Sequence, residues 1–379
     1  MRWLPFLSIL VILIFIGNGI TGSYKESAHG NSTYGVKRSS ISRYSRGLCA
    51  HCHEMHASIG GEEPEPSSSL GAFILFSINF DNSSNVRPDT GYNETHDFCF
   101  YCHGPNSLQV GGITNYDYSK TFGGAPENVN ATNIMDTFNQ ASYHNLYDIW
   151  NFAKDYFSSF FTSDSNPCVA CHNPHIAKRS CGKPGGSFDP TQSAISKPSD
   201  HKNLWGDDTS ERMNAYATGY TYQSPYWYNS TTYYEPACDT TSDGSNLPDY
   251  VTFCTDCHHH SPLPHSSILN RTLKDIDWET SVHGKTDSWK KEDTKERKAP
   301  YNATANYILS CTDCHEPHGS PNFKYLIRRE VNGDIVIINS DNDWDSLCSK
   351  CHTTDHHSNE TCIDCHYHGA TDNKTNPIF

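Results

Sequence analysis

Residues 311–318 read Cys311-Thr312-Asp313-Cys314-His315-Glu316-Pro317-His318. The first five form a C-x-x-C-H motif, which is the attachment signature of c-type haem. In that chemistry the two thiols add to the vinyl groups of the porphyrin, and the adjacent histidine becomes an axial ligand of the iron. The motif occurs seven times. In chain order, motif 1 is Cys49, Cys52 and His53; motif 2 is Cys99, Cys102 and His103; motif 3 is Cys168, Cys171 and His172; motif 4 is Cys254, Cys257 and His258; motif 5 is Cys311, Cys314 and His315; motif 6 is Cys348, Cys351 and His352; and motif 7 is Cys362, Cys365 and His366.

These motifs use fourteen of the 16 cysteines in the chain. A single C-x-x-C pair is also compatible with a zinc site or a redox-active dithiol. Seven copies, each followed at once by histidine, favour haem instead. The sequence therefore predicts seven covalently bound haem c groups, with the seven motif histidines as proximal ligands.

The N-terminus has the order of a secretory signal peptide, with Arg2 followed by an apolar run from Leu4 to Ile16 and then small residues. The run is shorter than the roughly 20 residues that span a bilayer; an uncleaved anchor is the alternative. We expect a signal peptide over 1–22 and a seven-haem region over 23–379 without a membrane span. The expected location is secreted, extracellular or on the cell surface, and nine N-x-(Ser/Thr) sequons are compatible with glycosylation there.

Two cysteines lie outside the motifs, Cys181 and Cys238. In an oxidising compartment we expect them to form a disulfide that brackets residues 182–237, an insertion without haem motifs. Two free thiols are the alternative, because the sequence does not show that the sulfurs meet. The end of the insertion is rich in tyrosine, which is compatible with a contact surface or with a small β-rich loop domain.

Apolar residues are scarce, at 35% of the chain even with tyrosine included. We therefore expect a mostly irregular polypeptide wrapped around a chain of stacked haems, with short helices and few small strands. Four elements are predicted: a strand over 70–80, a helix over about 139–160, a helix over 289–298, and a hairpin over 323–338 with Asn332-Gly333 as its turn.

The net charge of −15 makes nucleic acid an improbable partner.

An internal repeat predicts the distal ligands. Three segments share the order Ser-x-His-(Gly/Asn), a gap, and C-x-x-C-H-x-x-His, running from His29 to His56, from His144 to His175, and from His283 to His318. The thioethers pin each motif histidine to one face of its own haem, so a histidine three residues later reaches a neighbouring iron. We expect His56, His175 and His318 to serve adjacent haems. His29, His144 and His283 are then the distal ligands of the three units, and the repeat favours His29 serving its own unit.

A seventh distal ligand remains open among His96, His201, His260, His265, His356, His357 and His368. The preference is for His356 or His357, which lie between motifs 6 and 7. Methionine ligation is disfavoured because the chain has only 4 methionines. Bis-histidine haems are the expectation, and such haems have lower potentials than Met/His haems.

After motif 5 the chain continues Gly319-Ser320-Pro321-Asn322-Phe323. This segment resembles the paired-CxxCH multihaem cytochromes, whose repeats end in CxxCHxPHGS before a short apolar strand. Motif 3 matches that pattern with its proline, whereas motif 1 has Met55 at the proline position, and motifs 6 and 7 resemble the close-spaced doublet of the family. Similar exported proteins include subunits of extracellular cytochrome filaments (nanowires). The resemblance implies electron transfer, self-assembly into a head-to-tail polymer, and redox proteins or acceptors such as metal oxides as partners.

Three functions compete. Six-coordinate irons have no free position for substrate, so an electron carrier rather than an enzyme is expected. A multihaem reductase of nitrite, hydroxylamine or a similar small oxyanion would need one iron with an open face. A soluble periplasmic electron shuttle would share the ligation and differ only in assembly and location.

Overall fold

The computed structural model describes residues 24–33, 35–54, 75–80, 97–110, 133–175, 212–222, 227–228, 233–234, 249–281, 283–285, 296–299, 301–303 and 305–353. The expected signal peptide, Cys181, Cys238 and the whole of motif 7 lie outside these residues.

The described chain is mostly irregular, with short helices and two-residue strands, as the composition predicts. The α-helices are α2 (Phe100–His103), α3 (Ile134–Phe138), α4 (Leu146–Tyr156), α5 (Met213–Tyr216), α6 (Tyr250–His258) and α7 (Asp345–Cys348). Single 3-10 turns are η1 (Tyr24–Glu26), η2 (Ser39–Ile41), η3 (Cys49–His51), η6 (Pro167–Ala170), η10 (Tyr301–Ala303) and η11 (Cys311–Asp313). Several of these short elements carry or flank a haem motif.

The strands form pairs that tie distant segments together. β1 (Ser142–Tyr143) pairs antiparallel with β8 (Gly319–Ser320), and β2 (Thr221–Tyr222) pairs parallel with β7 (Tyr307–Ile308). The remaining pairs are local: β3 (Trp227–Tyr228) with β4 (Tyr233–Tyr234), β5 (His265–Ser266) with β6 (Arg271–Thr272), and β9 (Glu330–Val331) with β10 (Asp334–Ile335).

The hairpin predicted with an Asn332-Gly333 turn is confirmed, although its strands are shorter than 323–338. Asn332 and Gly333 have φ angles of 54° and 79°, the positive values that a two-residue hairpin turn of this type requires. Beyond the strands the two arms stay close, because the Phe323 amide donates to the Ile338 carbonyl at 2.7 Å.

The helix predicted over 139–160 is shorter, because two local contacts define its start. The side chain of Asn145 accepts hydrogen bonds from the amides of Tyr147 and Asp148, so α4 begins at Leu146. The residues before it, Ser142–Tyr143, extend and pair with β8 instead.

Two other predicted elements do not form in their described parts. Residues 75–80 make no strand; Leu75 and Phe80 each make an isolated β-bridge, to His53 and Asp97 respectively. Residues 296–298, the end of the predicted helix, are not helical, because Arg297 bridges to His352. In both places backbone pairing with residues at or beside a haem motif replaces the regular element.

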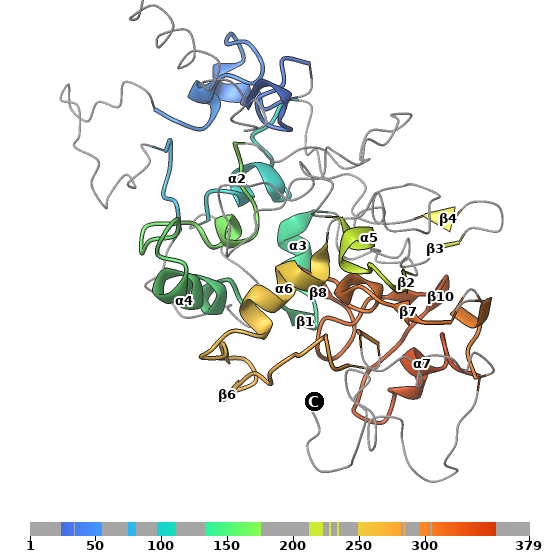
Figure 1. Ribbon diagram of the computed structural model, residues 1–379. Coiled ribbons are helices and arrows are strands. Elements are labelled where there is room, and N and C mark those ends of the chain that lie inside the picture. Colours follow the sequence, from blue (N-terminus) through green and yellow to red (C-terminus); the bar gives the residue numbers. More distant parts are fainter. Residues whose placement is uncertain are drawn as a thin grey trace, which may run out of the picture.

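The motifs follow one another through the molecule. In Figure 1 the blue segment 24–54 lies at one end, α3, α4 and α6 lie in the middle, and α7 lies in the orange-red part at the other end. Small apolar clusters accompany them rather than one large core. The largest joins Met213 of the expected insertion to Val251 of α6 and Ile308 of β7. No helix in the described residues is long and apolar enough to cross a membrane.

Candidate haem-binding site

Each described motif forms one tight helical turn that closes on its first cysteine. In motif 5 the Cys314 and His315 amides both donate to the Cys311 carbonyl, at 3.3 and 3.0 Å. The other described motifs repeat this arrangement: His53 to Cys49 at 2.8 Å, His103 to Cys99 at 2.9 Å, His172 to Cys168 at 2.8 Å and His352 to Cys348 at 3.0 Å, while motif 4 lies within α6. The turn brings two thiols and one imidazole together, as attachment to one haem requires.

Side-chain caps start three of these turns. Ser310 and Asp313 form a capping box at η11. Asn166 caps η6 and Asp249 caps α6, each by accepting a backbone N–H. A polar residue one to five positions before the motif therefore starts the helical turn that carries the thiols.

The buried thiols of the motifs suit covalent attachment to haem. The twelve cysteines of motifs 1 to 6 are not disulfide-bonded. Burial raises the pKa of the Cys314 thiol to about 12 and that of Cys171 to about 11, which disfavours the charged thiolate in the free protein. A thioether carries no such charge and suits a buried position.

Consecutive motifs are spatial neighbours. The sulfur atoms of Cys99 in motif 2 and Cys168 in motif 3 lie within 4.8 Å of each other. Cys254 of motif 4 interacts with Cys311 of motif 5. The remaining steps are marked by electrostatic interactions of Cys52 with Cys102, of Cys257 with Cys171, and of Cys351 with Cys314. Motifs 1 to 6 therefore follow one another in space in the order of the sequence.

Five motif histidines each face a second histidine. The ring centroids lie 6.0 Å apart for His53–His175 and His29–His103, 6.1 Å for His172–His318 and His144–His258, and 6.4 Å for His283–His352. A metal–nitrogen bond to histidine is roughly 2 Å long, so two imidazoles on opposite sides of one metal ion have centroids about 6 Å apart. These pairs thus fit the axial ligands of one haem iron.

The histidine pairs follow the internal repeat, but each histidine faces a motif outside its own repeat unit. The leading histidines His29, His144 and His283 face motifs 2, 4 and 6, the motif after the one in their own unit. The expectation that His29 serves its own unit is therefore wrong. The trailing histidines His175 and His318 face motifs 1 and 3, each two motifs earlier in the chain and in the preceding unit.

Backbone carbonyls orient several of these rings. The Nδ1 atom of His29 lies 2.7 Å from the Pro174 carbonyl oxygen, and Nδ1 of His144 contacts that of Pro317 in the same way. His315, a proximal ligand, has its Nδ1 atom 2.7 Å from the Tyr325 carbonyl oxygen. Donation from Nδ1–H leaves Nε2 for the iron and raises the basicity of the ligand.

Burial keeps these imidazoles neutral, which is the form that binds metals. It lowers the pKa of His172 to about 3 and the pKa values of His144 and His258 to about 4. The ring nitrogen lone pairs therefore stay available at neutral pH.

Two of the leading histidines, His29 and His283, each sit in a tight turn of the same kind. A Cβ atom on Gly30 would lie 2.0 Å from the Tyr24 carbonyl oxygen, and one on Gly284 would lie 1.7 Å from that of Trp278. Glycine is therefore required by close backbone approach. The sequence reasoning missed Tyr24 and Trp278, although each precedes its histidine by the same interval and this shared aromatic position was a visible signal.

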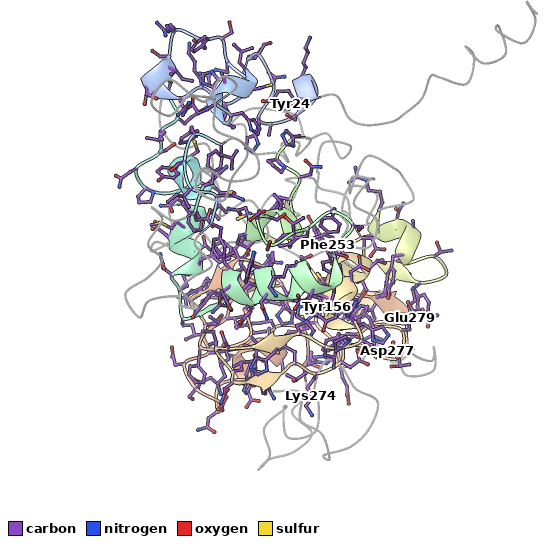
Figure 2. All side chains as sticks on the ribbon, turned by 90° about the vertical axis from the view of Figure 1, so that its left-hand side faces the viewer. Tyr24, Tyr156, Phe253, Lys274, Asp277 and Glu279 are labelled. Atoms are coloured by element: carbon purple, nitrogen blue, oxygen red, sulfur yellow. The ribbon has the colours of Figure 1, made fainter. Side chains whose placement is uncertain are left out.

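Several predicted ligands fall outside the part of the chain that the structure describes. His56, His357 and the motif 7 residues Cys362, Cys365 and His366 lie outside the described residues, as do His96, His201, His356 and His368. Of the two remaining candidates for the seventh ligand, His260 packs against Phe152 and Tyr156, and His265 is exposed in β5. Figure 2 shows Tyr156 at helix α4 in the middle of the molecule, far from Tyr24 at one end.

One comparison with known proteins bears on this site. A family model described as a doubled CXXCH motif matches residues 307–357, which contain motifs 5 and 6. The matched doublet is therefore this pair and not motifs 6 and 7. No curated protein and no solved structure matches the chain significantly. The doubled motif, within a mostly irregular fold whose cysteines form haem-attachment turns, indicates a multihaem c-type cytochrome with covalently bound haem.

Proposed function

We propose that the protein is an extracellular electron carrier that passes electrons along seven bis-histidine haems, and that it works as the subunit of a head-to-tail filament. The chain would hold the haems through its fourteen motif cysteines and seven proximal histidines. Bound haem supplies the one-electron couple, and the protein supplies ligands, orientation and exclusion of water.

The pairing of five motif histidines with five further histidines is the observation that supports this function best. A histidine on each side of an iron leaves no coordination position for a substrate. Closed irons favour electron transfer over bond chemistry. The succession of motifs 1 to 6 as neighbours favours transfer from haem to haem along the chain.

A reductase of a small oxyanion is the second candidate, and it requires an open iron. The paired histidines argue against an open iron at motifs 1, 2, 3, 4 and 6. A soluble shuttle would use the same closed haems without assembly, so only the assembly state separates it from the filament subunit.

The offset of the repeat supports assembly. His175 and His318 each reach back to a motif of the preceding unit. His56 holds the same position in the first unit. By the same relation His56 would ligate a haem of a unit before it, and motif 5 of a second copy would supply that haem. A contact of this kind between different surfaces propagates as an open helix.

Redox proteins and extracellular acceptors such as metal oxides are the proposed partners, and the exported location follows from the apolar N-terminal run. Electron microscopy of material sheared from cells, with haem counting on the purified chain, tests the function. Filaments containing seven low-spin haems per subunit are expected. A reproducible high-spin haem in the untreated protein would favour the reductase, and a monodisperse monomer at high concentration would favour the shuttle.

A further inference from the structure

The buried carboxylate of Glu316 contacts a distal ligand. Glu316 is 3% exposed, and its Oε1 atom lies 3.0 Å from Nδ1 of His318. The His318 amide also donates to Oε1 at 3.3 Å, and the Glu316 amide donates to the Leu326 carbonyl at 2.8 Å. Backbone and side chain are therefore both held, so the carboxylate stays against the His318 ring.

The carboxyl group of Glu316 is only partly hydrogen-bonded. Its Oε2 atom has no hydrogen-bond partner among the described residues. A charge in a buried site interacts with its surroundings far more strongly than one in water. The His318 ring and the iron that it would bind are thus the groups on which this charge acts most directly.

The corresponding positions of the other repeats differ. Asn173 accepts a hydrogen bond from the His175 amide at 3.0 Å but carries no charge. Glu54 is a carboxylate, but half of its side chain is exposed and it pairs with Arg38 at 3.3 Å. The leading ligands His29 and His144 use neutral proline carbonyls.

A carboxylate that accepts the Nδ1–H of an iron ligand gives the ring imidazolate character. The ring then donates more electron density to the metal and stabilises Fe(III) relative to Fe(II). The reduction, in which Fe(III) gains one electron, becomes less favourable, and the potential of that haem falls. His318 faces His172 at 6.1 Å, so the effect falls on the motif 3 haem.

We propose that Glu316 is a positioning residue that, through His318, lowers the potential of the motif 3 haem below that of the motif 1 haem, where Asn173 replaces it. This inference rests on the proposed function, because it assumes bis-histidine haems. It places a low-potential step in the interior of the haem chain, between the haems of motifs 2 and 4.

The test is Glu316→Gln in the full-length haem-loaded protein. Glutamine keeps an oxygen that accepts the His318 N–H and removes only the charge. Spectroelectrochemical titration should show one haem with a raised midpoint potential, while the optical spectrum remains low-spin. The matched control is Asp341→Asn, which removes an equal charge from an exposed carboxylate paired with Lys324 at 2.9 Å and should move no potential.

Unchanged potentials in Glu316→Gln would overturn the inference, as would an equal shift in Asp341→Asn. Loss of one low-spin haem in Glu316→Gln would also overturn it, because Glu316 would then only hold the ligand in place. If that variant does not assemble with haem, Asn173→Asp decides: a lowered motif 1 potential supports the inference and no change refutes it. A wild-type protein without bis-histidine haems would instead refute the proposed function itself.

Discussion

The rings of His172 and His318 lie almost parallel, with centroids 6.1 Å apart and planes only 5° apart. His53 and His175 are arranged in the same way, 6.0 Å apart at 6°. In both pairs the distal ring belongs to the fourth residue of a His-x-x-His segment. The pairs that use a leading histidine are tilted instead, by 58° for His29–His103, 44° for His283–His352 and 31° for His144–His258.

This difference predicts two spectroscopic classes of haem. For low-spin ferric haem, gmax rises as the planes of the two axial imidazoles turn away from parallel. We expect the smallest gmax values from the haems of motifs 1 and 3, and the largest among these five from motif 2. Low-temperature electron paramagnetic resonance of the oxidised protein measures this directly. One uniform set of g values would contradict the pairing geometry.

Removing a leading histidine should open one iron. His144 is the ring that faces His258 of motif 4. In His144→Ala we expect one haem per chain to become high-spin and, when reduced, to bind carbon monoxide, while the total haem count is unchanged. Added imidazole should restore the low-spin spectrum, because it can occupy the vacated position.

His265→Ala is the control for that variant, since His265 is exposed in β5. It should keep the wild-type spectrum. Carbon monoxide binding by His265→Ala, or none by His144→Ala, would show that the assignment of the motif 4 ligand is wrong.

The glycine beside a leading histidine should be intolerant of a side chain. In Gly284→Ala the new Cβ would meet the Trp278 carbonyl oxygen at 1.7 Å, so the turn that carries His283 must move. Overpacking of this kind costs roughly 1–3 kcal/mol, and we also expect weakened ligation of the motif 6 haem. Thermal unfolding and the spin state of the oxidised protein report the two effects.

Gly219→Ala is a matched substitution without the clash. Gly219 has a φ of +86°, and no atom of the described residues lies within 4 Å of the position of its Cβ. Only backbone strain is expected there, roughly 1 kcal/mol, with all haems remaining low-spin. Equal effects of the two variants on the spin state would argue against the close-approach explanation.

The sequence predicts the chemistry of the site better than its connectivity. The C-x-x-C-H spacing specifies a closed helical turn, and the short His-x-x-His spacing places His175 and His318 opposite the histidine of another motif rather than their own. Which motif His29 faces could not be read from the sequence, because that depends on how turns from different repeats pack. The limits of α4 were missed for a similar reason: Ser142 pairs with Ser320, a contact between distant segments that overrides the local helical pattern.

The last prediction concerns assembly and follows from the offset of the repeat. If His56 ligates the motif 5 haem of a second copy, His56→Ala should leave one haem per subunit without its distal histidine. We expect filaments to be lost or shortened, one high-spin haem to appear, and the haem count to stay the same. Electron microscopy and electron paramagnetic resonance on the same preparation measure both changes.

His265→Ala again serves as the control, because it removes an exposed histidine and should leave filaments intact. Intact filaments with only low-spin haems in His56→Ala would exclude this ligand from the contact between subunits. A high-spin haem in a wild-type preparation diluted to monomers would independently support it, since dilution removes the neighbouring copy without changing any residue.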